Sequence, residues 1–301
     1  MCLDYGSRDL SERPQMNLFN NVHLFSEIAA NWQHHARTED WWTSTNDLSR
    51  RAILDLKPNL ESRSQFSFGS IQQMRFSYFE MGAINSLDLF GLDELIIFSF
   101  YWQNRNIYTS VADIGANIGL HSVILGHMGF NVTSFEPDPI HGAEFSRNIA
   151  INDLTRVSLV PEAVNVDGGL VSFTRVLGNT TGSHITGAKA NPYGELDQIE
   201  VTATPFRNLL RSHDLIKLDV EGFEAHLLTT VSDDELGSTD VIGEIGTPEN
   251  AEQIFNRFHR SSMNLFSQKN NWEQVQAVDD MPTSHREGSF FLSNKHRMPW
   301  V

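Results

Sequence analysis

Four carboxylates follow directly on short apolar runs, and their positions suit ligand binding and proton transfer. Asp113 ends the run VAD, Glu136 ends SFE, and Asp219 and Glu221 lie at the end of LIKLDVE. Ionised carboxylates accept hydrogen bonds from hydroxyl groups, attract ammonium groups and remove protons. Because burying an unpaired charge is costly, we expect Asp219 and Glu221 to face a cavity.

The stretch VADIGANIGLH, residues 111–121, has an apolar approach followed by Gly115 and Gly119. It predicts a strand, a tight turn and a helix, a structure that lets backbone approach a ligand and directs free N–H groups toward it. The dinucleotide fingerprint requires G-x-G-x-x-G, whereas Asn117 occupies the place of its second glycine. A side chain there crowds a pyrophosphate, and the carboxylate of Asp113 repels phosphate and suits an ammonium group.

Glu136 supports the same interpretation from the next expected strand. It lies about 20 residues after Gly115, where an acid accepts hydrogen bonds from both ribose hydroxyls. A nucleoside pocket without room for a pyrophosphate favours S-adenosylmethionine (SAM) over NAD. Each feature alone also fits a simple structural role, with Asn117 as a helix cap and Glu136 as a solvated strand end. Their spacing on consecutive strands favours the cofactor.

The run LIKLDVEGFE, residues 215–224, places Lys217, Asp219 and Glu221 at the carboxyl end of another expected strand. In open α/β sheets the ligand crevice lies at that edge, so we expect both acids beside the glycine turn and Glu136. An internal ion pair with Lys217 is the structural alternative, and it is compatible with function.

From about residue 105, short β-rich runs alternate with helical runs, which predicts a Rossmann-like, doubly wound, mostly parallel α/β sheet. The expected strands are 110–114, 131–136, 157–161, 215–220 and 240–245, with closing strands at 263–267 and 289–292. The expected helices are 118–127, 139–152, 223–229 and 249–258. A strand pair at 171–174 and 199–204 flanks the polar stretch 178–198, which is too long for a simple turn and is a candidate lid.

The N-terminal part has a different character. We expect residues 1–104 to form a helical extension or cap and residues 105–301 to form the catalytic domain. Residues 88–102, DLFGLDELIIFSFYW, predict a largely buried helix that packs against the sheet. Asp93 and Glu94 suit its first turn, where acids interact favourably with the helix dipole.

Composition argues against several classes of protein. The net charge of −16, without a Lys/Arg cluster, disfavours nucleic acid and anionic membranes as partners. No apolar run is long enough to span a membrane, and acids and Arg come before any apolar run at the N-terminus, so we expect a cytoplasmic protein. The one cysteine, Cys2, can form neither an internal disulfide nor a cysteine-based zinc site.

Five stretches together resemble the FkbM-type methyltransferases, a family of class I SAM-dependent enzymes, over about residues 90–245. They are VADIGANIGLHS, SFEPDP, RNIAIND, AVNVDGGLVSF and, most specifically, IKLDVEGFEAHLL. The resemblance implies a seven-stranded sheet, SAM as methyl donor and, usually, O-methylation of a hydroxyl on a sugar, polyketide or other small molecule. Residues 1 to about 85 match no pattern of the family.

The chemistry and the positions of individual residues predict their roles. The methionine end of SAM is expected at Asp113, Gly115, Asn117 and Gly119, with Asp113 near the ammonium group, the ribose at Glu136 and the adenine at Ala163. A base must remove the acceptor proton, and its candidates are Asp219, Glu221 and, in the candidate lid, His184. His121 is expected to pack or to cap its helix.

Other functions stay open at this point. A nicotinamide-dependent oxidoreductase on the same sheet is disfavoured by Asn117, and a non-catalytic module that binds SAM or carbohydrate is disfavoured by the acids around Asp219. A divalent metal held by Asp219 and Glu244 lacks an evident third ligand, so we expect no metal. The expected partner is a small-molecule acceptor, and homo-oligomerisation is left open.

Overall fold

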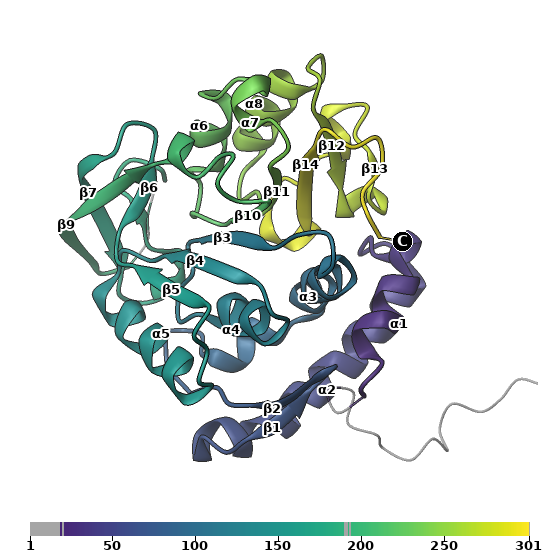
Figure 1. Ribbon diagram of the computed structural model, residues 1–301, viewed down its shortest axis with the longest axis vertical. Coiled ribbons are helices and arrows are strands. Elements are labelled where there is room, and N and C mark those ends of the chain that lie inside the picture. The colour runs from purple at the N-terminus through teal and green to yellow at the C-terminus, as the bar shows by residue number, and fades with distance from the viewer. Residues whose placement is uncertain (1–18, 20, 190–191, 193, 301) are drawn as a thin grey trace, which may run out of the picture.

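An eight-stranded sheet runs through the molecule in the order β13-β12-β14-β11-β10-β3-β4-β5 (Figure 1). Its strands are β3 (Ser110–Ile114), β4 (Asn131–Phe135), β5 (Val157–Val160), β10 (Leu215–Leu218), β11 (Asp240–Glu244), β12 (Asn264–Ser267), β13 (Glu273–Gln274) and β14 (Ser289–Ser293). The computed structural model describes residues 19, 21–189, 192 and 194–300, so Cys2 lies outside the described residues.

The predicted doubly wound, mostly parallel sheet is confirmed. Strands β11, β10, β3, β4 and β5 are parallel to one another, whereas β14 runs antiparallel to both β11 and β12. The prediction of seven strands falls short by β13, an edge strand of two residues that pairs with β12. So short a strand has no periodicity that a sequence pattern could reveal.

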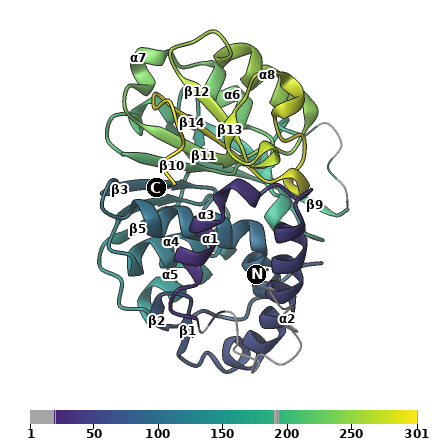
Figure 2. The ribbon, with the colours of Figure 1, turned by 90° about the vertical axis from the view of Figure 1, so that its right-hand side faces the viewer.

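Helices cover both faces of this sheet. The helices that follow its strands are α4 (Leu120–His127), α5 (Pro139–Ile151), α6 (Glu224–Thr229), α7 (Asp233–Leu236) and α8 (Pro248–Phe258). Side chains of β3 alternate between the faces, because Val111 packs into the cluster with α3 and α4 while Ala112 and Ile114 pack into the cluster with α6 and α8. Figure 2 shows α4 and α5 on one half of the molecule and α6, α7 and α8 on the other.

The N-terminal segment shares a core with the sheet. Its elements are α1 (Leu24–Ala30), α2 (Asp40–Ser62), the strand pair β1 (Phe66–Phe68) and β2 (Ile71–Met74), and α3 (Leu92–Asn104). Phe25, Leu56 and Phe98 from this segment belong to the same buried cluster as Val123 of α4 and Phe291 of β14. No helix among the described residues is both long and apolar enough for a membrane span.

The helix expected over residues 88–102 begins later than predicted. Gly91, with an extended backbone (φ −60°, ψ 165°), separates α3 from a short 3₁₀ helix at Ser86–Phe90. Asn85 and Asp88 form a capping box on that short helix. Two separate helices therefore replace the continuous one.

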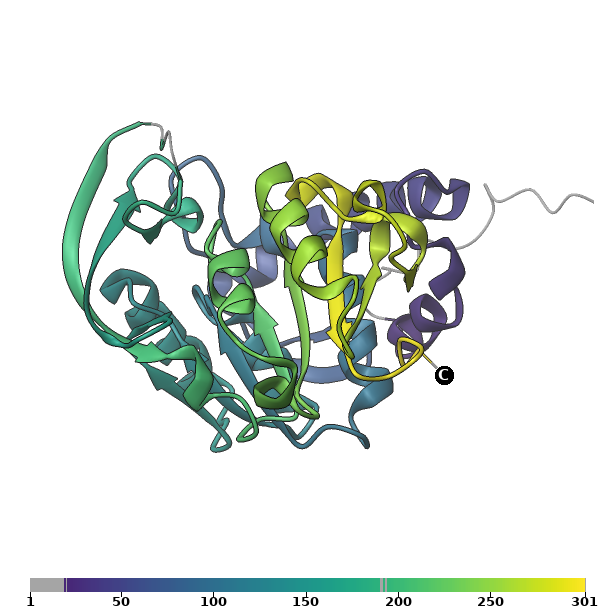
Figure 3. The same cartoon turned by 90° about the horizontal axis from the view of Figure 1, so that it is seen from above.

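A second sheet stands beside β5, with strand order β6-β9-β7-β8. It contains β6 (Ala163–Asn165), β7 (Gly169–Val176), β8 (His184–Ile185) and β9 (Leu196–Pro205). Strands β7 and β9 are the expected accessory pair, longer than predicted and antiparallel. Figure 3 shows this teal sheet curving out at the end of the molecule opposite the purple N-terminal helices.

Candidate functional site

A cavity of about 140 Å³ lies at the carboxyl ends of β3, β4 and β10, beside the second sheet. Seven of the nine predicted site residues line it, namely Gly115, Asn117, Glu136, Ala163, His184, Asp219 and Glu221. The other two, Asp113 and Gly119, do not. The ends of these three strands thus meet at the crevice expected for an open α/β sheet.

The turn between β3 and α4 takes the tight form that its glycines predict. Gly115 has a φ of 75°, and a Cβ built on it would lie 1.8 Å from the backbone oxygen of Asp219. Only glycine allows β3 and β10 to come so close at this point. Asn117 is also left-handed, with a φ of 52°, a conformation that asparagine tolerates better than most residues.

Glu136 is fixed by two backbone N–H groups at the cavity wall. Its Oε2 accepts from the N–H of Asn117 at 2.8 Å and its Oε1 accepts from that of Asp138 at 2.8 Å. Burial raises the pKa of Glu136 to about 7, although both N–H bonds act to lower it. Each carboxylate oxygen has a further lone pair, so the group can still accept two ligand hydroxyls.

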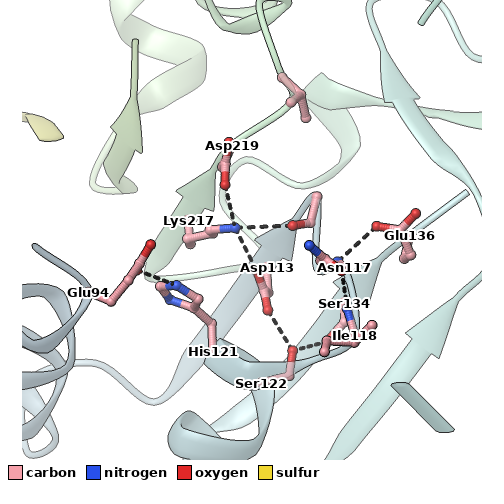
Figure 4. A network of polar contacts seen from close by, with 12 residues as sticks. Glu94, Asp113, Asn117, Ile118, His121, Ser122, Ser134, Glu136, Lys217 and Asp219 are labelled. Carbon is pink, nitrogen blue, oxygen red and sulfur yellow. Dashed lines mark hydrogen bonds and ion pairs between the residues drawn. The ribbon is translucent and has the colours of Figure 1, made fainter. Parts of the chain in front are cut away.

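Asp113 points away from the cavity, contrary to its expected place near an ammonium group. Its carboxylate is fully buried, with Oδ2 accepting from the hydroxyl of Ser122 at 2.6 Å and Oδ1 lying 3.6 Å from Nζ of Lys217. Ser122 is hydrogen-bonded in turn to Ser134 at 2.7 Å. Figure 4 shows Asp113 between Lys217 and Ser122, with Glu136 farther away beyond Asn117.

Gly119 also has a packing role rather than a place in the cavity wall. Its φ is 89°, and a Cβ there would lie 2.7 Å from the ring of Phe145 on α5. The missing side chain therefore lets the start of α4 approach α5. This use of a glycine for close packing resembles the third glycine of dinucleotide-binding turns.

The turn after β10 carries Asp219 and Glu221 into the cavity. Glu221 has a φ of 55°, which is strained for a residue with a long side chain, and Gly222 follows with a φ of 107°. Glu224 holds this turn, because its Oε1 accepts from the N–H of Val220 at 2.9 Å and its carboxylate also accepts from the N–H of Gly222. Burial raises the pKa of Glu224 to about 7.

The ion pair of Lys217, which the sequence offered as a structural alternative compatible with function, is present. Its Nζ lies 3.4 Å from Oδ2 of Asp219 and donates to the backbone oxygen of Gly115 at 3.1 Å. Burial acts to lower the pKa of Lys217, but Asp219 and Asp113 raise it above its usual value. Lys217 therefore links the glycine turn to the acids on β10 and stays charged.

The first half of the candidate lid contributes to the wall of the cavity. The short 3₁₀ helix Thr180–Gly182 and strand β8 supply Thr180, Thr181 and His184 to the lining. His184 is 2% exposed, and burial lowers its pKa, so the ring is neutral at neutral pH. Lys189 joins this segment to the β10 turn through an ion pair with Glu221. Burial and the nearby Asp219 raise the pKa of Glu221.

Sequence patterns did not single out some side chains that lie near the crevice. His141 of α5 lines the cavity and is hydrogen-bonded to Thr180 at 2.8 Å. Glu94 lines a smaller neighbouring cavity together with His121 and Glu244, which the sequence had indicated only as a helix residue and a possible metal ligand. The sequence marked Glu94 only as an acid in the first turn of a helix, and no other sequence pattern pointed to it. Among the described residues, no three His, Cys, Asp or Glu side chains form a group that could hold a metal.

Fold and crevice define a Rossmann-like α/β protein with a pocket at the carboxyl edge of its parallel strands. A family model described as the methyltransferase FkbM domain matches residues 113–276, more than half of the chain. The chain belongs to this family of SAM-dependent methyltransferases, and SAM is its cofactor. The predicted resemblance is confirmed, and the matched segment extends further toward the C-terminus than expected.

Several solved structures are similar to the chain, whereas none of the curated proteins matches it. A ribosomal protein L11 methylase from Lactobacillus delbrueckii subsp. bulgaricus has 14% identity over 56% of this chain and 68% of its own, with a TM-score of 0.33. A precorrin-6y C5,15-methyltransferase from Geobacter metallireducens has 10% identity over 55% and 70%, with a TM-score of 0.33. A SAM-dependent methyltransferase from Agrobacterium tumefaciens has 8% identity over 67% and 62%, with a TM-score of 0.37.

Proposed function

We propose that this methyltransferase transfers the methyl group of SAM to a hydroxyl oxygen of a small molecule, such as a sugar-containing natural product. The observation that carries the proposal is the presence of Asp219, Glu221 and His184 in the same cavity as Glu136 and the glycine turn. Groups able to accept a proton therefore face the space in which the cofactor's nucleoside would be held.

The cofactor's parts are assigned to the wall residues by their chemistry. Glu136 accepts hydrogen bonds from the ribose hydroxyls with the lone pairs that its two backbone N–H contacts leave free. Ala163 and its neighbours at the start of the second sheet contact the adenine. The bare backbone of Gly115 and the left-handed turn at Asn117 leave room for the chain that leads to the sulfur.

Methyl transfer to oxygen needs alignment and removal of one proton. When bound, SAM supplies an electrophilic methyl group on a positively charged sulfur. The residues of this chain hold the acceptor hydroxyl in line with that methyl group and take its proton as the new C–O bond forms. Asp219 and Glu221 are the first candidates for the base, and His184, with its neutral ring, is the third.

The class of acceptor follows from the charges around the crevice. Asp219, Glu221 and Glu136 line the cavity, while the nearby lysines are already paired, Lys217 with Asp219 and Lys189 with Glu221. An anionic acceptor would meet repulsion there, whereas hydroxyl groups would meet hydrogen-bond acceptors. The chain's net charge of −16 also argues against nucleic acid as the substrate.

The test has a binding part and a turnover part. Calorimetry should show SAM binding with one site per chain and no binding of NAD. Incubation with SAM labelled in its methyl group and a panel of hydroxylated acceptors should then give a labelled methyl ether and S-adenosylhomocysteine. Binding of NAD but not SAM would refute the cofactor assignment. SAM binding with methyl transfer only to amines or carboxylates would refute O-methylation.

A further inference from the structure

SAM carries an amino acid at its methionine end, and the cavity described so far offers no carboxylate for that ammonium group in the expected place. The carboxylate predicted for this contact, Asp113, is buried against Ser122 and Lys217. Glu136 lies at the ribose position. Asp219 and Glu221 also line the cavity, but both are already paired with lysines, so a further acid near the glycine turn is a candidate partner for the ammonium group.

A second, smaller cavity lies next to the first one and has the required chemistry. Its lining includes Glu94, His121, Lys217, Asp219 and Glu244, which combine both signs of charge. Asp219 is the one described residue that lines both cavities. The second cavity therefore begins where the acids of the β10 turn stand, beside the turn through Gly115.

Glu94 is held in this cavity by two other side chains. Nε2 of His121 lies 2.8 Å from Oε2 of Glu94, and Nδ1 of His121 lies 3.0 Å from the hydroxyl oxygen of Tyr101. Burial raises the pKa of Tyr101 well above its usual value, so the tyrosine keeps its proton and can donate it to Nδ1. The ring proton then lies on Nε2 and is donated to Glu94.

These contacts leave Glu94 with one oxygen free. Oε2 takes part in the bond with His121, no other described residue is hydrogen-bonded to Oε1, and the Glu94 side chain is 28% exposed, so Oε1 can accept from a ligand. Figure 4 shows Glu94 and His121 on the opposite side of Lys217 from Glu136. A bound SAM with its ribose at Glu136 would thus direct its other end past the glycine turn toward this acid.

The rest of the cavity suits the carboxylate of the same amino acid. Glu244 lies beside Asp219 and Glu94, and burial together with these two acids raises its pKa well above its usual value. A protonated Glu244 carboxyl is a hydrogen-bond donor, and Lys217, although paired with Asp219 and Asp113, lines the same cavity. The cavity therefore offers an acceptor for an ammonium group and donors for a carboxylate, which is what a zwitterion requires.

We propose that Glu94, positioned by His121 and Tyr101, binds the α-ammonium group of the methionine part of SAM. The proposal rests on the proposed placement of the ribose at Glu136. Glu94 lies before residues 113–276, the segment that the family model matches, so the N-terminal segment completes the cofactor site.

The experiment compares two ligands that differ in the amino acid. Calorimetry is carried out with SAM and with 5′-methylthioadenosine, which keeps the adenosine and sulfur but lacks the amino-acid part. In the Glu94→Gln variant we expect the affinity for SAM to fall about tenfold or more, because a charge-assisted hydrogen bond is lost. The affinity for 5′-methylthioadenosine should stay unchanged. Glu252→Gln, at an exposed position on α8, is the matched control and should bind both ligands like the parent protein.

A second variant covers the case in which Glu94→Gln fails to fold. Tyr101→Phe keeps the buried ring but removes the hydroxyl that orients His121, so it should weaken SAM binding by a few-fold and leave 5′-methylthioadenosine binding unchanged. Equal affinities of parent and variants for SAM, or equal losses for both ligands, would overturn the proposal. If the parent protein binds neither ligand, the proposed function itself fails.

Discussion

Two turns meet at the site, and they reach their shapes in different ways. The turn from β3 to α4 depends on residues within it, since Gly115 and Asn117 adopt left-handed conformations that their own types allow. The turn from β10 to α6 places Glu221 in the same left-handed region, where its type is not favoured. Glu224, Asn250 of α8 and Lys189 of the lid hold that second turn.

The comparison shows that a left-handed turn can be stabilised either by the residue types within it or by tertiary contacts to it. A turn that depends on local types is read directly from its sequence and should be sensitive to any added atom. A turn that is held by contacts with other segments should tolerate substitutions that change the size of its own side chains. It should lose its role in binding or catalysis when a contacting side chain or a charge is removed. Substitutions in and around the two turns test this distinction.

The largest effect is expected at the first turn. In Gly115→Ala the new Cβ would lie 1.8 Å from the backbone oxygen of Asp219, so β3 and β10 would have to separate. We expect a loss of more than about 3 kcal/mol in the free energy of unfolding, together with loss of SAM binding. Thermal and denaturant unfolding would measure it.

Gly129→Ala is a control that measures the cost of a left-handed alanine without the steric clash expected at Gly115. Gly129 also has a positive φ, 94°, but a Cβ added there would have no other atom within 4 Å. This control should lose only about 1 to 2 kcal/mol, the usual cost of a left-handed alanine. Similar losses in both variants would mean that the close approach of β3 and β10 is unimportant.

Substitutions of the acids in the second turn should lower the turnover rate of the enzyme and leave its free energy of unfolding nearly unchanged. Asp219→Asn and Glu221→Gln keep volume but cannot accept a proton at neutral pH, so whichever acid is the base should lose about 10²-fold or more in turnover. SAM affinity should change little in Asp219→Asn, whereas Glu221→Gln also loses the ion pair with Lys189 and should release SAM faster. Melting curves must accompany the rates. Full activity in both variants would contradict a catalytic role for the acids and would leave His184 as the candidate base.

A smaller, pH-dependent effect is expected at Glu136, which both turns flank. Its pKa of about 7 means that the carboxyl is neutral below that pH and ionised above it. Because the ionised form is the better acceptor for ribose hydroxyls, SAM affinity should fall as the pH drops from 8 to 6, by at most about tenfold per unit below the pKa. Glu136→Ala should bind SAM weakly at every pH, and a pH dependence that persists in this variant would assign the titration to another group.

The smallest effect on stability is expected for the lid contact. Lys189 and Glu221 are 32% and 35% exposed, so solvent screens their attraction and Lys189→Gln should cost less than about 1 kcal/mol. SAM should nevertheless dissociate faster, because this ion pair joins the lid to the β10 turn. Stopped-flow displacement of SAM would measure the rate, and an unchanged rate would argue against a closing role for Lys189.

Parts of the site could be read from the sequence because they depend on short-range rules. Strand ends in a parallel sheet share one edge, so Glu136, Asp219 and the glycine turn had to meet once the strands were recognised. The left-handed glycine at 115 follows from its place in a strand-turn-helix. The same reasoning located β3 at its observed bounds, Ser110–Ile114.

Other features depend on which side chains pack together from distant parts of the chain. No local pattern shows that Asp113 turns inward to Ser122 and Lys217, or that Gly119 is needed for the ring of Phe145. Nor does one show that Lys189 reaches Glu221.

The amino-acid sequence by itself determined the strand-turn-helix units and the edge of the sheet at which the acids gather, because the rules involved act over a few residues. Tertiary structure alone decided which of the acids face a cavity and which form hydrogen bonds or ion pairs with buried neighbouring side chains. Glu94 shows the reason most clearly. In the sequence it is an ordinary acid at a helix start, and only the packing of α3 against α4, through Tyr101 and His121, brings its carboxylate to the cavity beside Asp219.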